Sequence, residues 1–596
     1  MSFPSIRVFT ITIIGLLLFT GASTTSAQSG VIKLNGSLVS GGNVFSNILS
    51  PDGRTVVYFA TQDNSAVVEM YSVPVTGGSS PVKLNGTLVS GGAIANVIIS
   101  PDSSQVVYVA DQDTDGVFEL YSVPIGGGTP VKLNGQLPNL SSVTVSPQIS
   151  PDSSRVIYVA DQDTFNVNEI YSVPIGGGTP VKLNGQLVSG GTVSTTFQIS
   201  PDSSRVVYQA DQDTNGVFEL YSAPIGGGNS PVKLNGTLVS GGDVESNFLI
   251  SANSSTVVYR ADQDTDNLLE IYSAPISGGS AVKLNSTLVS GGTTLPNFQI
   301  SANSTTVVYM ARQENPNISE LYSVPIGGGT PVKLNGTLAS NRLVQGFKLT
   351  PDSSRVVYQA DEAPQDADDL YSVPIGGGNA VKLTSMAKLD ISPDASNFYQ
   401  ITPDSRTVVY RSDENTTNVF EFFSVPVTGG TVRQLNGPIV SGGTLNKSQT
   451  SFIISADSRV LVYEGDQTTD NVDEVYAVSL TGCQVATTSL NGTLSANADV
   501  RRFSVTPDGT RVVYVADQDT AGVTELYSVR VNATNPLSIY DVDTDSTISP
   551  SDSIFVLNRL NAPITNAIAN ADVDCNGAIN NTDANAIIQR IGQRIN

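Results

Sequence analysis

Two acidic stretches near the carboxyl end carry the residues best suited to chemistry. They read DVDTDSTISPSD at 541–552 and DVDCNGAINNTD at 572–583. Side-chain oxygens recur at positions 1, 3, 5, 9 and 12, and position 7 offers its main-chain carbonyl. This spacing wraps the roughly six to eight oxygens that Ca2+ prefers around one point. The predicted metal ligands are Asp541, Asp543, Asp545, Thr547, Ser549 and Asp552 in the first loop, and Asp572, Asp574, Asn576, Ala578, Asn580 and Asp583 in the second.

The residues around these ligands favour folded loops over the alternative of an acidic disordered tail. Position 8 is Ile548 in one loop and Ile579 in the other, an apolar residue that can tie paired loops together. Each loop runs into a helical pattern, at 553–560 and 584–595. Gly577 suits the sharp turn at position 6, where the first loop has Ser546. We therefore predict two bound calcium ions.

This arrangement, over about 541–595, resembles a type I dockerin. The resemblance implies a small α-helical domain that folds on binding two calcium ions and docks onto a cohesin domain of a scaffolding protein or cell surface. It also implies partner contacts at positions 10 and 11 of each loop, which are Pro550, Ser551, Asn581 and Thr582. Proline at position 10 and Cys575 within the second loop depart from the family pattern.

The tail is preceded by ten sequence repeats of about fifty residues each. The tyrosine of its VVY-like segment falls at Tyr58, Tyr108, Tyr158, Tyr208, Tyr259, Tyr309, Tyr358, Tyr410, Tyr463 and Tyr514. One unit contains four short extended segments, TTFQIS, RVVYQA, VFELYSAPI and PVKLNG, separated by SPDS, DQDTNG and GGG turn signals. Four antiparallel strands per unit predict a β-propeller blade, whereas the coils of the competing β-solenoid are shorter.

The phase of the repeat predicts ring closure. VIKLNG at 31–36 precedes every other predicted strand, and the last unit ends on ELYSVRV without a KLN segment. The first strand can therefore complete the last blade and remove two exposed edges. The predicted fold is all-β, with ten four-stranded blades in one ring or, alternatively, in two smaller rings, followed by the α-helical tail domain. The segments SPDGRTVVYFATQD and TPDGTRVVYVADQD resemble the TolB-type, WD40-like propeller repeat, which implies the blade but no particular ligand.

Polar residues that recur in each blade favour a structural role over a catalytic one. The ELYS-type glutamate recurs as Glu69, Glu119, Glu169, Glu219, Glu270, Glu320, Glu421, Glu474 and Glu525. We interpret these and the DQD aspartates as satisfying backbone amides and ordering the hairpin, with a ring of shallow cation sites as the alternative. No catalytic or cofactor-binding residue is assigned. Residues that break the repeat are better candidates for a ligand site: Arg260, Arg312, Glu314, Asn315, Arg411 and Glu464.

Composition narrows the class of protein. The net charge of −24 argues against nucleic-acid binding, and the absence of histidine removes the usual general base and zinc ligand. Residues 1–27 have the layout of a secretory signal peptide, and no later segment could span a bilayer. The predicted domains are this signal peptide, the propeller at 28–531, a linker at 532–540 and the calcium-binding domain at 541–596. Cys483 and Cys575 fall in separate domains, so a disulfide and two free thiols both stay open.

Two readings of the whole chain follow. The first is a secreted or surface-attached, non-catalytic binding protein. Its propeller holds an unknown protein or glycan, and its tail attaches to a cohesin-like partner through calcium. The second is an extracellular polysaccharide-degrading enzyme, a glycoside hydrolase or lyase on a propeller scaffold. The lack of histidine weakens the second reading without excluding carboxylate-pair glycosidases.

The calcium assignment predicts coupled folding of the tail. A purified tail fragment should be disordered in chelator and should gain helix when calcium is added, because the loops supply too few apolar contacts to fold unaided. Circular dichroism measures this change. Identical spectra in both conditions would contradict the metal assignment.

Overall fold

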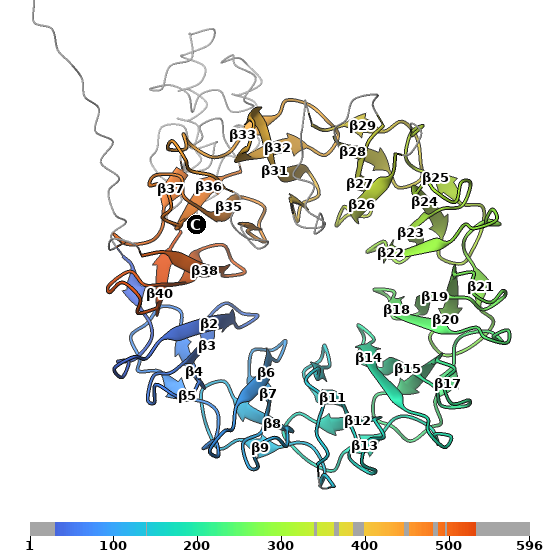
Figure 1. Ribbon diagram of the computed structural model, residues 1–596, viewed down its shortest axis with the longest axis horizontal. Helices are drawn as coiled ribbons and strands as arrows, with labels where there is room; N and C mark the ends of the chain where they lie inside the picture. The colour runs from blue at the N-terminus through green and yellow to red at the C-terminus, as the bar shows by residue number, and fades with distance from the viewer. Residues whose placement is uncertain are drawn as a thin grey trace, which may run out of the picture.

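The computed structural model describes residues 30–531, except for 139, 339–341, 363–368, 385–397, 446–451, 481–486 and 495–497. The predicted signal peptide, both calcium loops, the four predicted cohesin contacts and the two cysteines lie outside the described residues. Within the described part, forty strands form ten four-stranded antiparallel sheets. The sheets are the blades of one closed ring, so the prediction of ten blades is confirmed and the two-ring alternative is wrong (Figure 1).

Each blade has an inner, a second, a third and an outer strand, counted from the middle of the ring (Figure 1). The inner strands of blades 1 to 10 are β2 (Val44–Leu49), β6 (Ile94–Ile99), β10 (Gln148–Ile149), β14 (Val193–Ile199), β18 (Val244–Ile250), β22 (Thr294–Ile300), β26 (Val344–Leu349), β30 (Tyr399–Ile401), β34 (Phe452–Ile454) and β38 (Val500–Val505). The second strands are β3 (Thr55–Ala60), β7 (Gln105–Ala110), β11 (Arg155–Ala160), β15 (Arg205–Ala210), β19 (Thr256–Ala261), β23 (Thr306–Ala311), β27 (Arg355–Ala360), β31 (Thr407–Thr416), β35 (Val460–Gly465) and β39 (Arg511–Ala516).

The third strands are β4 (Glu69–Pro74), β8 (Glu119–Pro124), β12 (Glu169–Pro174), β16 (Glu219–Pro224), β20 (Glu270–Pro275), β24 (Glu320–Pro325), β28 (Asp369–Pro374), β32 (Val419–Pro426), β36 (Glu474–Ser479) and β40 (Glu525–Arg530). The outer strands are β5 (Val82–Lys83), β9 (Val131–Lys132), β13 (Val181–Lys182), β17 (Val232–Lys233), β21 (Val282–Lys283), β25 (Val332–Lys333), β29 (Val381–Lys382), β33 (Arg433–Gln434), β37 (Thr487–Ser489) and, for blade 10, β1 (Ile32–Lys33).

The core is divided among the interfaces between blades. In β15, Val206 and Tyr208 pack against blade 3, whereas Val207 packs against blade 5. Both faces of the strand are therefore covered, which explains why the VVY part of RVVYQA is continuously apolar and does not alternate with polar residues. The stacked pair Tyr208 and Tyr221, with ring centroids 5.6 Å apart, packs in the same interface as Val206. Each of the other nine blades has an equivalent stacked pair, which is Tyr–Phe in blade 8 and Tyr–Tyr elsewhere.

The first strand closes the ring, as the phase of the repeat predicts. Strand β1 pairs antiparallel with β40, aligning Ile32 with Ser528 and Lys33 with Tyr527. A hydrophobic cluster joins blade 10 to blade 1 through Val513, Val515 and Leu526. The seam is therefore packed like the interfaces between blades that follow one another in sequence.

A belt of hydrogen bonds runs through the turns between inner and second strands. In each of eight consecutive interfaces of the described ring, the turn Asp or Asn donates its N–H to a serine hydroxyl of the next blade. The lengths lie between 2.9 and 3.1 Å, as for Asp152 to Ser203 at 3.0 Å. Each of these serines has a positive φ, which is 60° at Ser203. A residue with a β-carbon is strained at a positive φ, and the hydrogen bond accepted by the serine hydroxyl offsets this strain.

Glycine replaces this serine at the two remaining interfaces, which lie on either side of blade 10. Gly53 and Gly509 have φ values of 68° and 69°. A β-carbon on Gly53 would lie 2.8 Å from Cδ of Pro507, closer than real contacts allow. The belt is therefore interrupted beside the blade that the first strand completes.

The belt yields a stability prediction at Ser203. Ser203→Ala should lower the free energy of unfolding by about 1 kcal/mol, because one hydrogen bond is lost while the positive φ is kept. Ser203→Gly loses the same bond but relieves strain of roughly 1 kcal/mol, so it should stay near wild type. Urea denaturation followed by tyrosine fluorescence compares the two. Equal losses in both variants would show that strain does not matter at this position.

Candidate binding face of the ring

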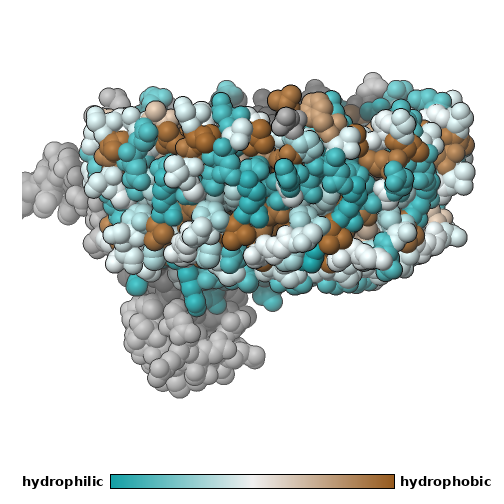
Figure 2. Space-filling model, turned by 90° about the horizontal axis from the view of Figure 1, so that it is seen from below, coloured by the Kyte–Doolittle hydropathy of each residue, from teal (hydrophilic) through white to brown (hydrophobic). Residues whose placement is uncertain are grey.

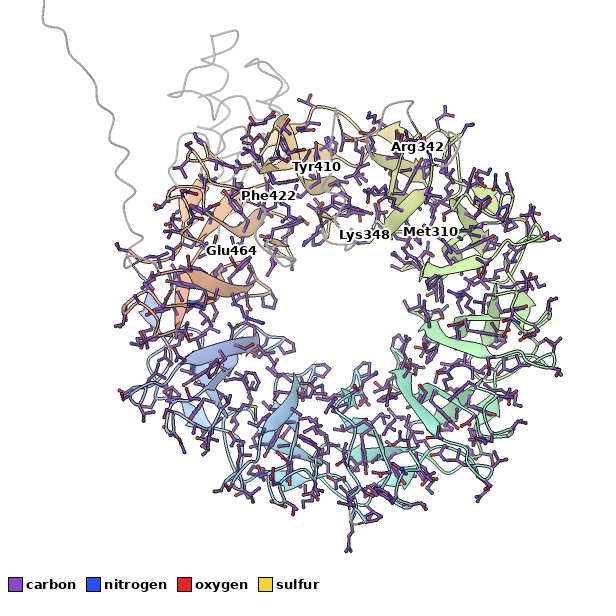
Figure 3. All side chains as sticks on the ribbon, viewed as in Figure 1. Met310, Arg342, Lys348, Tyr410, Phe422 and Glu464 are labelled. Carbon is purple, nitrogen blue, oxygen red and sulfur yellow. The ribbon has the colours of Figure 1, made fainter. Side chains whose placement is uncertain are left out.

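Antiparallel strand order sorts the connections onto two faces. The turns that join inner to second strands and third to outer strands lie on one side, which we call the turn face. The hairpins that join second to third strands, and the crossovers from each outer strand to the next inner strand, lie on the other side, the hairpin face. The middle of the ring is open, and no described side chain crosses it (Figure 3).

Blade 4 shows how the repeated carboxylates of the hairpin face are used. Asp211 accepts hydrogen bonds from the N–H groups of Thr192 (2.6 Å) and Gly216 (2.8 Å), which confirms its predicted role of ordering the hairpin. Asp213 and Glu219 both bind Nζ of Lys233, at 2.7 Å each. The prediction that the glutamate satisfies backbone amides is therefore wrong, because its oxygens bind an outer-strand lysine and, at 3.0 Å, the Tyr221 hydroxyl.

Blade 7 keeps this network with shortened side chains that the motif search missed. Asp369 occupies the glutamate position and binds Nζ of Lys382 at 2.7 Å. Thr384 replaces the KLN asparagine and donates to Asp369 at 2.7 Å. Aligning DDLYS with the FELYS-type segments would have found both residues.

Residues that break the repeat occupy two kinds of position. Arg260, Arg411 and Glu464 are equivalent, because each follows the buried tyrosine of its second strand, in blades 5, 8 and 9. Side chains at this position face the next blade; Gln209, the equivalent in blade 4, donates to the Val244 carbonyl at 2.6 Å. Arg411 lies over the Phe420 ring, with 5.9 Å between guanidinium carbon and ring centroid.

The other three residues belong to the blade 6 hairpin. Glu314 binds Lys333 at 2.7 Å and so replaces the second DQD aspartate, and Asn315 accepts from the N–H of Asn317 at 2.9 Å. Arg312 stands where blades 2 to 5 have the first DQD aspartate. The six candidates therefore do not form one catalytic cluster, and only Arg260 and Arg312 fall at the same blade interface.

Lys348 is a further departure from the repeat that sequence reasoning missed. It lies on inner strand β26, at the inner edge of the ring, where blades 3, 4, 6 and 8 have glutamine (Figure 3). Its Nζ donates to the Tyr399 carbonyl at 2.7 Å and lies 4.7 Å from the centroid of that ring. The glutamines donate to the next blade in the same way, as Gln299 does to the Phe347 carbonyl at 3.1 Å. Burial lowers the pKa of Lys348 to about 8.

The described residues were compared with the requirements of a metal site and of a membrane-spanning helix. No group of three or more Asp, Glu, Cys or His residues in this part of the chain could hold a metal ion. Nor does this part contain a helix of the length and apolarity needed to cross a bilayer. On the side seen in Figure 2, the wall of the ring carries a hydrophilic band broken by separate hydrophobic patches.

The chain leaves the ring on the turn face. Strand β40 runs from the hairpin face to the turn face, and the N–H of Val531 then donates to the Thr510 carbonyl at 2.8 Å. Val31 packs in the same cluster as Val531. Whatever follows residue 531 is therefore attached on the side opposite the hairpins.

Comparison with protein families matches two parts of the chain. Residues 539–592 match the dockerin type I domain, and residues 69–211 match the lipoprotein LpqB beta-propeller domain. The chain thus combines a ten-bladed β-propeller with a C-terminal segment that matches the dockerin type I domain. No curated protein matches the sequence.

Several solved structures of low sequence identity are similar to parts of the chain. Oligogalacturonate lyase in complex with manganese is 13% identical, with 65% of this chain and 88% of the lyase covered and a TM-score of 0.31. Dipeptidyl peptidase 4 of Porphyromonas gingivalis is 10% identical, with 71% and 56% covered and a TM-score of 0.41. A structure assigned as TolB from Agrobacterium tumefaciens is 18% identical, with 48% and 90% covered and a TM-score of 0.24. These similarities give no information on ligands.

The lowered pKa of Lys348 predicts a pH-dependent stability difference. Above pH 8 the folded chain releases a proton that the unfolded chain keeps up to its ordinary pKa of 10.5, so this group's destabilising effect is complete below pH 8 and fades as pH rises toward 10.5. Lys348→Gln keeps a donor for the Tyr399 carbonyl. It should raise the melting temperature at pH 7 and lose this advantage near pH 10.5, as measured by calorimetry across pH. A gain that does not vary with pH would contradict the assignment.

Proposed function

We propose that this protein is an exported, non-catalytic binding and assembly protein. The ring presents its hairpin face to a ligand, and the C-terminal domain attaches the ring to a cohesin-like partner in a calcium-dependent way. The match of residues 539–592 to dockerin type I carries this proposal. Export is part of it, because residues 1–27 read as a signal peptide and dockerin modules are typical of extracellular assemblies.

The calcium chemistry rests on the loop residues. Type I dockerins generally bind calcium, and Asp541, Asp543 and Asp545 recur in the second loop as Asp572, Asp574 and Asn576. Hard carboxylate and amide oxygens at alternate positions suit Ca2+. Two ions, an α-helical fold and partner contacts through Pro550, Ser551, Asn581 and Thr582 belong to the proposal.

The geometry of the ring supports attachment through the turn face and ligand binding on the hairpin face. The dockerin follows Val531, which leaves from the turn face. The hairpin face therefore stays accessible when the protein is attached. It also carries the departures from the repeat at Arg260, Arg312 and Glu314, whereas the turn face repeats nearly the same residues in each blade.

The enzymatic alternative gains no support from the repeated carboxylates. In blade 4, Glu219 and Asp213 are both engaged by Lys233, and Asp211 accepts hydrogen bonds from two backbone N–H groups. A glycosidase needs two carboxylates with separate, tuned roles. The repeated residues are engaged in the same contacts from blade to blade, so a catalytic pair would have to come from other residues.

The attachment is tested by cohesin binding. The full chain is expected to bind at least one member of a panel of immobilised cohesin domains in millimolar calcium, and to dissociate in chelator. Biolayer interferometry measures both steps. A chain ending at Val531 is the control and should bind none of the panel. Calcium-independent binding, or binding that survives loss of residues 532–596, would contradict the proposal.

The same preparations test the alternative reading. The full chain, incubated with acidic and neutral polysaccharides, is expected to release neither reducing ends nor unsaturated products. Turnover that depends on the ring, and that persists in the chain ending at Val531, would establish an enzyme in place of a binding protein.

A further inference from the structure

Two arginines on neighbouring blades stand at positions where most other blades have an uncharged or an acidic residue. Arg260 ends the VVY-type run of blade 5, where blades 2, 3 and 10 have Val109, Val159 and Val515. Arg312 opens the blade 6 hairpin, where blade 5 has Asp262. Valine at the first position shows that the fold does not require a charge there.

The repeat geometry brings these two positions to one place. Gln209, equivalent to Arg260, reaches the Val244 carbonyl of the next blade at 2.6 Å. Asp262, equivalent to Arg312, accepts from the N–H of Asp243 in its own blade at 2.6 Å. Residues 243 and 244 are consecutive, so the two positions meet where an inner strand begins. One interface further along, the positions of Arg260 and Arg312 therefore both fall beside the start of β22, where the N–H of Arg312 donates to the Thr293 carbonyl at 2.9 Å.

One buried N–H group of each arginine, at Nε, lacks a hydrogen-bond partner among the described residues. Arg260 is only 8% exposed, and its Nε has no hydrogen-bond partner among the described residues. Its ion pair with Glu245 is long, 3.9 Å from Nη2 to the carboxylate oxygen. Nε of Arg312 is likewise buried and without a partner in the described part of the chain. A buried N–H group that lacks an acceptor is costly and calls for an explanation.

Arginines on the turn face show what a satisfied side chain looks like here. Nε of Arg205 donates to the Ser222 hydroxyl at 2.7 Å, and its Nη2 donates to the Ser222 carbonyl at 3.2 Å. Arg155 and Arg355 repeat this arrangement with Ser172 and Ser372. Nε of Arg511 in blade 10 likewise donates to the Ser528 hydroxyl at 3.0 Å. The repeat therefore supplies an acceptor for Nε of these turn-face arginines, and it supplies none for Nε of Arg260 or Arg312 among the described residues.

We propose that Arg260 and Arg312 bind one carboxylate group of a ligand at the inner rim of the hairpin face, between blades 5 and 6. Two guanidinium groups offer the planar, paired donors that match a carboxylate. With Glu245 beside them, the three side chains leave one net positive charge, which suits a monoanion better than a phosphate dianion. The nearby Asp243 is directed elsewhere, because it accepts from the N–H of Phe218 in blade 4 at 2.7 Å.

This proposal rests on the proposed function, in which the hairpin face binds a ligand, and it specifies that the ligand carries a carboxylate. It does not depend on attachment through the dockerin. The carboxylate can come from an acidic sugar or from a small organic acid. Glucuronate and acetate represent these two sources, and glucose is the neutral counterpart of glucuronate. The strongly acidic chain repels extended polyanions, so an isolated carboxylate is favoured over a densely charged polymer.

Saturation-transfer NMR and thermal shift with the full chain test the site. Glucuronate, acetate or both should bind the wild type, and glucose should not. Arg260→Met introduces the residue of the next blade, Met310, and Arg312→Asp restores the aspartate of blade 5. Each variant should weaken carboxylate binding at least tenfold, while Arg260→Met should melt at the same or a higher temperature because a desolvated charge is removed.

Two further variants keep the test decisive. Arg205→Met removes an arginine from the turn face and should bind the carboxylate probe like wild type. Arg260→Gln, which copies Gln209 of blade 4, replaces Arg260→Met if that variant folds poorly. Unchanged binding in the Arg260 and Arg312 variants, or equal binding of glucose and glucuronate, would overturn the proposal. Cohesin binding by the same variants should be unaffected, so failure here is distinguishable from failure of the attachment.

Discussion

The structure depends on burial of both faces of each second and third strand. A strand such as RVVYQA in β15 is apolar on both sides, so a single blade would leave half of it in water. Stacking blades covers these faces in pairs, but a linear stack would still expose its two ends. Pairing of β1 with β40, together with the cluster that joins blade 10 to blade 1, removes those ends. Closure is therefore a consequence of two-sided apolar strands and needs no separate device.

The two faces of the ring are under different constraints. On the turn face, the belt that includes Asp152 and Ser203 links each turn to the next blade, and it works only if the serine keeps a strained φ. That requirement fixes residue type and conformation together, which explains why this face hardly varies. On the hairpin face, the network of Asp213, Glu219 and Lys233 is internal to one blade, so a neighbouring blade can change without breaking it.

Some positions of the repeat tolerate different side chains without a change in the fold. Valine, glutamine, arginine and glutamate all occur at the position of Arg260, so the interface accepts different sizes and charges there. An inner-edge residue such as Lys348 keeps the hydrogen bond that glutamine makes in other blades, at the cost of a buried charge. Arg260 stands at the hairpin end of β19, whereas Lys348 is the penultimate residue of β26 and stands near the turn face. A uniform scaffold can therefore carry local, blade-specific chemistry.

The sequence by itself determined the strand order, the number of blades and the closure by the first strand, and it predicted the spacing of the calcium ligands. Strand order and ligand spacing are encoded locally, by turn residues, apolar runs and ligand positions within a few residues of one another, whereas closure follows from the phase of the whole repeat. Only the tertiary structure decided that ten blades form one ring, because identical units close either way and the choice lies in small rotations between blades. It also corrected the role of Glu219, whose lysine partner comes from another strand, and revealed Lys348 and the serine belt, whose partners lie about fifty residues away in the neighbouring blade. Contacts between repeats leave no mark within a single repeat, so their identity emerges only when the blades are packed side by side.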